Sequence, residues 1–332
     1  MAAPVSASPF SKPSERDGRP MKISVVTPLY RSAPYVEELC ARLKKTVAQI
    51  GADQYEIVLV NDASPDDDLS IAKRVADADP HVAVIDLSRN FGQHSALMTG
   101  LRHADGDLVF ILDSDLEEEP EWMALFHAEM VRTGSDVVFG VNTAAKGNVP
   151  YRLGRRLFYS ALRTLSGVEF PQDVVTARLM TRRYVDALLE YGEREMFLAG
   201  IWHMVGFSQL PVAVQKHKSS STTYTLWRLV SLFVNGVTSF STRPLVAVSV
   251  AGLIFSTVAL LFTGWVVLRQ VVYGVAAEGW ASVMAGVLVV GGAIMFFNGL
   301  IAIYVAKIFI EVKNRPLTTI REIYKSRDPR SG

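Results

Sequence analysis

Hydrophobic positions follow two different patterns along the chain. Between residues 21 and 217, short apolar runs alternate with segments in which apolar residues recur every three or four positions. The apolar runs, which predict strands, are Ile23–Val26, Ile57–Val60, Val82–Ile85, Leu108–Leu112 and Val137–Val141. The amphipathic segments, which predict helices, are Tyr35–Ile50, Leu69–Ala78, Gln93–His103 and Trp122–Arg132. This alternation predicts an α/β domain with a doubly wound, mostly parallel sheet and helices on both faces.

Two later stretches are apolar and contain no ionisable side chain. Leu245–Leu268 and Trp280–Ala306 are each longer than the roughly 20 residues that cross the core of a bilayer, and they predict two transmembrane helices. Lys and Arg gather before the first stretch and after the second, whereas the loop between them carries Arg269 beside Glu278. Because positive residues favour the cytoplasmic side, we expect a multi-pass protein of the cytoplasmic (inner) membrane with both termini and the soluble domain in the cytoplasm.

Three further segments flank these parts. Residues 1–20 lack the apolar core of a signal peptide and predict a disordered N-terminal tail. Residues 218–243 have apolar positions at helical spacing and predict an amphipathic helix on the membrane surface, although a helix in the core of the soluble domain has the same pattern. Residues 307–332 predict a basic cytoplasmic tail, so the soluble domain is expected at 21–217 and the two spans within 244–306.

Composition narrows the classes of function. The formal net charge is +1, so nothing favours a nucleic-acid partner. Cys40 is the single cysteine, which excludes an intrachain disulfide and a Cys-rich zinc site. The hydrophobic content of 49% is high for a soluble protein and agrees with a lipid bilayer as a partner.

The segment FILDSDLEEEPEW, residues 110–122, places two aspartates and three glutamates after a predicted strand. Asp113 and Asp115 stand at i and i+2 of an extended segment, so their side chains point the same way and can share Mg²⁺ or Mn²⁺. Glu117 is close enough to join this metal site, whereas Glu118 and Glu119 favour the start of the next helix. Ligands of doubly wound sheets bind beyond the carboxyl ends of the strands, where such a metal would suit the diphosphate of a sugar nucleotide.

Four segments together resemble one known family. NDASPDD, LSRNFGQHSALMTGLRHADGDLVFILDSDLEEEPE, FVNGVTSFSTRPL and EVKNRPL look like the membrane-bound family 2 glycosyltransferases that load a sugar onto polyprenyl phosphate. That group includes bactoprenol glucosyltransferases and relatives of dolichol-phosphate mannose synthase. The likeness runs from about Ile23 to Leu317. It implies a catalytic domain of the GT-A type, followed by the interface helix and the two transmembrane helices.

The resemblance also implies roles for single residues. The nucleotide-sugar donor would contact Pro28, Tyr30, Asp62, Arg89 and Asp113. The metal would be held by Asp113, Asp115 and Glu117, and catalysis would fall to Asp115, Arg178 and Asp173. The acceptor phosphate would meet Arg178, with Lys146 and Arg155 behind it. Other interpretations stay equally open. Tyr30 would then pack in the core, Arg89 would be a surface residue, and the basic run around Lys146 and Arg155 would attract anionic lipid.

The chain departs from the family pattern at three positions. Asn61 and Thr176 stand where relatives usually have Asp, and Thr223 stands where they have Lys. Asp173 lies near Thr176 and could replace the missing carboxylate. A general base is less necessary here because a phosphate monoester has a second pKa of about 6 and is already mostly dianionic at neutral pH.

We therefore expect an inverting glycosyltransferase that moves a hexose, with UDP-glucose as the expected donor, to undecaprenyl or another polyprenyl phosphate at the cytoplasmic membrane face. Such a product would serve cell-envelope polysaccharide or lipopolysaccharide modification. A GDP-mannose-dependent polyprenyl-phosphate mannose synthase and a non-catalytic membrane partner protein with the same fold stay open. Small residues in the second span, at Gly286, Gly291, Gly292 and Gly299, would allow a homo-oligomer.

Overall fold

The computed structural model describes residues 20–143, 164, 173–193, 198–217, 237–238, 241–273 and 279–326. The chain divides into two compact units. Unit 1 comprises Met1–Gly147, Phe170–Thr223 and Arg315–Gly332, and unit 2 comprises Asn148–Glu169 and Tyr224–Asn314. The predicted tail at 1–19, most of the predicted interface helix, and Lys146, Arg155 and Thr223 lie outside the described residues.

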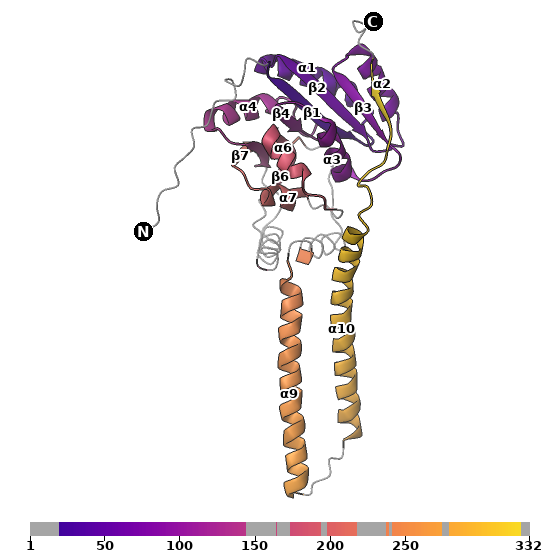
Figure 1. Cartoon of the computed structure of the whole chain (residues 1–332), viewed down its shortest axis with the longest axis vertical. Helices are drawn as coiled ribbons and strands as arrows, with labels where there is room; N and C mark the ends of the chain where they lie inside the picture. Colours follow the sequence, from indigo (N-terminus) through magenta and orange to yellow (C-terminus); the bar gives the residue numbers. More distant parts are fainter. Residues whose placement is uncertain are drawn as a thin grey trace, which may run out of the picture. The chain divides into compact units, whose positions relative to one another are not determined.

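Within the described residues, unit 1 contains one sheet of eight strands in the order β7-β5-β6-β4-β1-β2-β3-β8 (Figure 1). The strands are β1 Lys22–Leu29, β2 Gln54–Asn61, β3 Val82–Leu87, β4 Leu108–Ile111, β5 Val137–Asn142, β6 Val174–Thr181, β7 Gln209–Val214 and β8 Ile320–Lys325. β1 pairs in parallel with β2 and β4, β2 with β3, and β5 with β7. The predicted fold class, a mostly parallel α/β sheet, is confirmed.

Helices cover both faces of the sheet. They are α1 Val36–Ile50, α2 Asp68–Ala78, α3 Gln93–His103, α4 Trp122–Thr133, α6 Arg182–Leu189 and α7 Leu198–Met204. α1, α2 and α4 share one core of buried side chains with the sheet, and α3, α6 and α7 share the other. α3 lies so close to β1 that a Cβ on Gly100 would be 2.3 Å from Cγ1 of Val26, so this helix can pack there only with glycine at that position.

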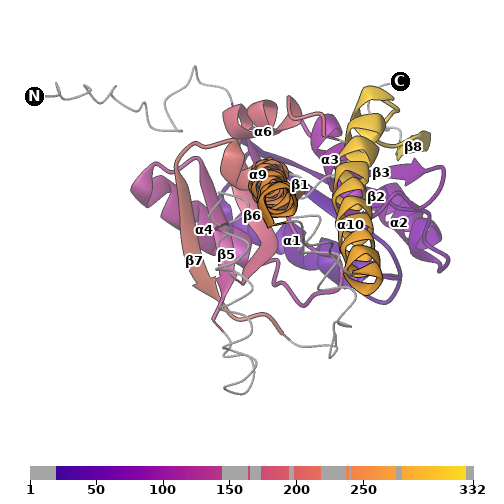
Figure 2. The same cartoon turned by 90° about the horizontal axis from the view of Figure 1, so that it is seen from below.

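Three strands, β6, β7 and β8, are not predicted by the sequence pattern. β6 lies between β4 and β5 and is antiparallel to both, and its apolar run is interrupted by Thr176 and Arg178. β8 comes from the predicted basic tail and pairs antiparallel with β3 at one edge of the sheet (Figure 2). Its charged side chains, Arg321, Glu322 and Lys325, are typical of an edge strand. Part of the segment at 307–332 is therefore folded into unit 1.

Unit 2 contains two long apolar helices, α9 Arg243–Tyr273 and α10 Trp280–Val312. Both are long and apolar enough to cross a membrane. Large apolar side chains along them are exposed, among them Leu253, Leu260 and Phe296, which distinguishes them from core helices of a soluble protein. The hydroxyl of Tyr304 in α10 donates to the carbonyl oxygen of Ser241, just before α9, at 2.8 Å.

Candidate active site

The carboxyl ends of the parallel strands bring together the segments that follow β1, β2 and β4. Leu29 at the end of β1 pairs with Asn61 at the end of β2. β6 runs the opposite way, so its first half lies at the same edge, where Arg178 pairs with Ile111. Four non-glycine residues near this edge have a positive φ, namely Arg31, Ala63, Leu116 and Asp173. Strained backbone of this kind clusters at functional sites, and here it marks the ligand edge of the sheet.

An acidic cluster lies beyond β4, and a lysine lies among its carboxylates. Nζ of Lys216, two residues after β7, is 3.5 Å from Oδ2 of Asp113, 3.4 Å from Oε2 of Glu117 and 3.6 Å from Oε1 of Glu118. Burial alone would lower the pKa of Lys216, but the carboxylates around it outweigh burial and raise that pKa. The ammonium is therefore the counter-ion of the cluster.

Asp113 is held by side chains from three elements. Its Oδ1 accepts a hydrogen bond from Gln93 at the start of α3, and its Oδ2 accepts one from the hydroxyl of Thr176 at 3.2 Å. Burial raises the pKa of Asp113; Lys216 opposes this shift and Asp115 adds to it. Thr176, one of the departures from the family pattern, thus lies inside the cluster, where an aspartate would add one more negative charge.

Glu118 does not have the helix-start role that the sequence suggested, because its side chain is fully buried. Its Oε1 accepts the backbone N–H of Thr176 at 2.9 Å, and its Oε2 accepts that of Asp113 at 3.3 Å. Burial and the neighbouring Asp113 raise the pKa of Glu118 to about 7. One carboxylate therefore joins the loop after β4, strand β6 and Lys216.

The donor set fits a hard cation that is shared with a ligand. Asp113, Asp115 and Glu117 offer carboxylate oxygens, and one oxygen of Asp115 accepts the N–H of Glu117 at 3.0 Å. Among the described residues, no group of three His, Cys, Asp or Glu is arranged to hold a metal on its own. Mg²⁺ is usually bound through one or two carboxylates, with substrate phosphates and water completing the shell. The residues present suit that mode of binding.

Arg178 is buried on the α3, α6 and α7 side of the sheet, with 2% of its surface exposed. Its Cζ lies 3.1 Å from the centre of the Trp202 ring. No carboxylate among the described residues comes within ion-pair distance of it. Burial lowers the pKa of Arg178 to about 9, against the opposing effects of Tyr184 and Glu118. A buried cation without a paired anion is costly, so this position is typical of a site that receives an anion.

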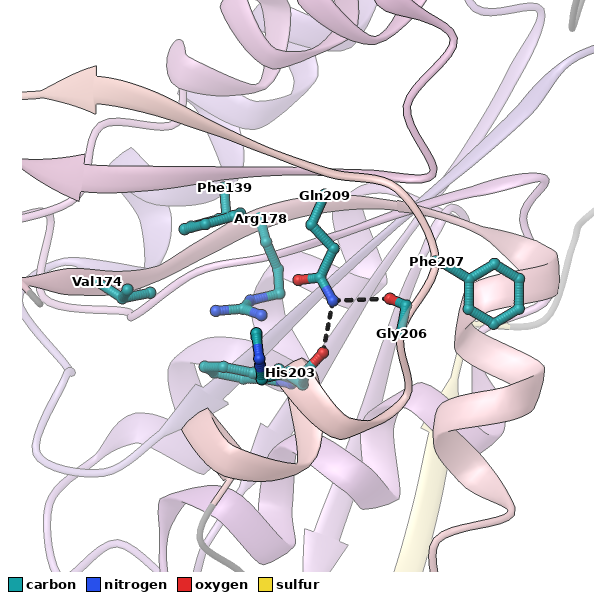
Figure 3. A pocket seen from close by; sticks show the side chains of 8 residues that line it. Phe139, Val174, Arg178, His203, Gly206, Phe207 and Gln209 are labelled. Carbon is teal, nitrogen blue, oxygen red and sulfur yellow. Dashed lines mark hydrogen bonds between the residues drawn. The ribbon is translucent and has the colours of Figure 1, made fainter. Parts of the chain in front are cut away.

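Arg178 lines a cavity of about 380 Å³ (Figure 3). The lining residues come from β5, β6, α7 and the start of β7, and they are Phe139, Val174, Arg178, Trp202, His203, Gly206, Phe207 and Gln209. Gln209 donates to the carbonyl oxygens of Trp202 and Gly206 and so fixes the turn after α7. The indole N–H of Trp202 is buried and has no hydrogen-bond partner in the described part of the chain. The cavity is therefore lined by a cation and by aromatic side chains.

Asp62, the residue predicted to contact the nucleotide, is 2% exposed at the end of β2. Its two oxygens accept the backbone N–H groups of Phe91 and Gly92 at 2.7 and 2.8 Å. Gly92 has a φ of 91°, which favours glycine. Burial raises the pKa of Asp62, while these two hydrogen bonds and Arg89 oppose the shift. In this structure Asp62 fixes the loop that follows β3.

The other predicted residues lie around the same edge. Pro28 is buried in β1, whereas Tyr30 and Arg89 are exposed, with Arg89 stacked 4.0 Å above the ring of Phe91. Asp173 precedes β6 and its carbonyl oxygen accepts the N–H of Asn142. Lys146 and Arg155 lie outside the described residues.

Sequence reasoning missed Lys216, Glu118 and Trp202. Lys216 follows a strand that the pattern did not reveal, and Glu118 is one of three consecutive glutamates that only the fold distinguishes. Trp202 lies on the seven-residue helix α7, which is too short for a periodic signal.

The asparagine at the end of β2 has its own partner. Nδ2 of Asn61 donates to Oδ1 of Asp86 in β3 at 2.8 Å, and Nη1 of Arg321 in β8 donates to the other oxygen at 2.9 Å. Asp86 is 2% exposed. An aspartate at position 61 would place two carboxylates in contact, so asparagine is the residue that fits this neighbour.

The chain is similar to a known protein family and to curated relatives. Residues 24–189 match the family model Glycosyl transferase family 2. A Mycobacterium tuberculosis (strain CDC 1551 / Oshkosh) protein named as a glycosyltransferase is 42% identical over 92% of this chain and 89% of its own length. The prophage bactoprenol glucosyl transferase homolog of Escherichia coli (strain K12) is 32% identical over 92% of this chain and 100% of its own.

Solved structures that are similar to this chain include the mannosyltransferase PcManGT from Pyrobaculum calidifontis in complex with GDP-Man and Mn2+. It is 17% identical and covers 89% of this chain and 87% of its own, with a TM-score of 0.40. The family model and the two relatives together decide the classification. The chain is a glycosyltransferase and belongs to glycosyl transferase family 2.

Proposed function

We propose that this enzyme transfers a hexose from a nucleotide-sugar, with UDP-glucose as the first candidate, to a polyprenyl phosphate at the cytoplasmic face of the membrane. The observation that carries the proposal is an acidic cluster around Asp113, suited to a cation, together with the buried, unpaired guanidinium of Arg178, which lies two residues after Thr176 on β6. Relatives named as bactoprenol glucosyl transferases support the polyprenyl part.

The two charged regions suit two anionic reactants. The donor carries a diphosphate and the acceptor a monoester phosphate, and these groups must approach each other for transfer to occur. Asp113 and Asp115, with Glu117 beside them, would hold a divalent cation that neutralises charge on the departing nucleoside diphosphate. Arg178 would orient the acceptor phosphate in the cavity. The two anionic reactants would thus be bound in different ways, the donor through a cation held by carboxylates and the acceptor through the guanidinium of Arg178.

The reaction is a direct displacement with inversion. An oxygen of the acceptor phosphate forms a bond to the anomeric carbon, and the bond from that carbon to the diphosphate oxygen breaks. The acceptor oxygen needs no general base because the phosphate is already dianionic near neutral pH. Thr176 in place of an aspartate is compatible with this chemistry, since its hydroxyl positions Asp113 and takes no proton.

The helices α9 and α10 fit an acceptor that stays in the bilayer. A two-helix anchor holds the catalytic domain at the membrane face and raises the local concentration of a lipid-linked acceptor. Their exposed apolar side chains support this role.

The test is incubation of the detergent-purified full chain with undecaprenyl phosphate, Mg²⁺ and a panel of sugar nucleotides that includes UDP-glucose and GDP-mannose. We expect one lipid product whose mass equals undecaprenyl phosphate plus a hexose, together with release of the matching nucleoside diphosphate. A product from GDP-mannose alone would replace the donor assignment. Donor binding without any lipid product would contradict the proposal and favour the non-catalytic partner.

A further inference from the structure

Lys216 occupies the centre of the acidic cluster. Its ammonium is within 3.6 Å of three carboxylates, from Asp113, Glu117 and Glu118. The side chain is largely buried, with 23% of it exposed. Two of these carboxylates, those of Asp113 and Glu117, belong to the expected metal ligands, so the lysine and a divalent cation compete for the same negative charge.

The chain around Lys216 is attached to the same loop. The N–H of His217 donates to the carbonyl oxygen of Glu117 at 3.0 Å, and the ring of His217 contacts the carboxylate of Glu119. The ammonium is therefore delivered by a segment docked along residues 117–119 and is not a freely moving surface group. A docked charge competes at a high effective concentration.

The cluster also lacks the means to bind a metal by itself. Among the described residues no three ligating side chains converge on one point, and Asp113 already accepts hydrogen bonds from Gln93 and Thr176. Diphosphate oxygens would supply the missing ligands. Cation and donor are thus expected to depend on each other.

We infer that Lys216 is a tethered counter-ion that keeps the acidic cluster closed to divalent cations until the nucleoside diphosphate arrives with one. This inference rests on the proposed metal role of Asp113 and Asp115. Its consequence is positive coupling: the diphosphate strengthens cation binding because its oxygens compensate for displacement of the lysine. Removing the ammonium should therefore tighten cation binding most when no nucleotide is present.

The experiment measures Mn²⁺ binding to the detergent-purified full chain by electron paramagnetic resonance, with Mn²⁺ alone and with UDP or GDP added. For the wild type we expect weak binding of Mn²⁺ alone and much tighter binding with the nucleotide. Lys216→Met should tighten the binding of Mn²⁺ alone by about tenfold or more, because an ion-pair competitor has been removed. Lys73→Met, which removes an exposed ion pair with Glu322, should leave it unchanged.

A chemical rescue keeps the test independent of folding. The chain has a single cysteine, Cys40, which is buried, and burial raises its pKa to about 12, so it resists alkylation. Lys216→Cys therefore offers one reactive thiol. Treatment with 2-bromoethylamine restores an ammonium at nearly the original length, and it should return the Mn²⁺ affinity of Lys216→Cys to that of the wild type.

The outcomes separate this inference from the proposed function. Unchanged or weaker binding of Mn²⁺ alone in Lys216→Met and Lys216→Cys, with nucleotide-dependent binding in the wild type, would overturn the role of Lys216 and leave the metal site standing. Absence of Mn²⁺ binding in every sample, nucleotide included, would overturn the metal role and the inference with it. Lipid product formation is measured separately and decides the transfer reaction.

Discussion

Two aspartates at the ends of β2 and β4, the strands on either side of β1, satisfy their charges in different ways. Asp62, after β2, accepts backbone N–H groups of Phe91 and Gly92 on its two oxygens. Asp113, after β4, is surrounded by side chains: the amide of Gln93, the hydroxyl of Thr176 and the ammonium of Lys216. The first environment belongs to one loop, and the second is assembled from three distant parts of the chain.

The difference teaches which of the two carboxylates is prepared to exchange partners. Backbone donors are fixed by the fold and cannot leave Asp62 without unfolding the loop after β3. Side-chain donors can rotate away, and an ammonium can be replaced by another cation at small structural cost. We therefore assign Asp62 to the shape of the nucleotide end and Asp113 to ligand exchange.

The largest expected effect comes from removing charge at the exchangeable site. Asp113→Asn should lower kcat by about 10³-fold or more, because the cation that balances the charge on the departing diphosphate loses a carboxylate ligand. The measurement is product formation at saturating donor and Mg²⁺. Asp186→Asn, which removes an exposed carboxylate on α6, serves as the control. Retention of full activity in Asp113→Asn would remove this aspartate from the mechanism.

Arg178 is expected to separate activity from stability. Arg178→Met should reduce kcat by about 10²–10³-fold, while the protein unfolds at the same or a higher temperature. Replacing even a paired buried charge by apolar side chains is often neutral or stabilising by about 1–4 kcal/mol, and an unpaired charge has no ion pair to lose. Arg132→Met, at an exposed position of α4, should change neither quantity. Strong destabilisation by Arg178→Met would mean that the guanidinium supports the fold instead of binding an anion.

The difference in stability between Arg178→Met and the wild type is expected to depend on pH. Burial lowers the pKa of Arg178 far below its ordinary range, to about 9, so above about pH 9 the unfolded chain retains a proton that the folded chain has lost. The penalty for burying the charge is complete below about pH 9 and disappears as the pH rises towards the ordinary pKa of arginine. The stability advantage of Arg178→Met over the wild type should therefore be constant from pH 7 to 8.5 and smaller at pH 10.5. Thermal unfolding at these three pH values measures it, and an advantage that grows with pH would contradict the assignment.

Local patterns predict the fold well and the site only in part. The four predicted helices recur within one residue of their predicted boundaries, as α3 at Gln93–His103 shows, and the five predicted strands recur with β1 and β2 longer than predicted, because each element carries its own apolar period. The cluster around Asp113 is different, since Thr176 and Lys216 reach it through β6 and the end of β7. No local period encodes contacts between residues that lie 63 and 103 positions from Asp113 along the chain. Asp113 was predictable because Asp115 and Glu117 follow it closely in the sequence.

Replacement of Asp62 should affect donor binding more than the transfer step. Asp62→Asn leaves one backbone N–H without a good acceptor, which costs about 1–3 kcal/mol of loop stability. We expect a donor KM about tenfold higher and a smaller change in kcat than for Asp113→Asn, and steady-state kinetics with varied donor would show it. A loss of kcat as large as that of Asp113→Asn, at unchanged donor KM, would place Asp62 in the reacting centre.

The smallest expected effect lies one step further from the ligand edge. Arg321 reaches from β8 to Asp86, which in turn holds the amide of Asn61 beside Asp62. The side chain of Arg321 is 55% exposed, so water can replace much of its contact, and pairs of this kind contribute less than about 1 kcal/mol. Arg321→Met should therefore raise the donor KM by about twofold and leave kcat unchanged, whereas Lys73→Met, which removes the pair of Glu322 on the same strand, should change neither. A donor KM that rises as far as in Asp62→Asn would show that the strand returning after α10 sets the shape of the nucleotide end, because the effect would then pass through Asp86 and Asn61 at nearly full strength.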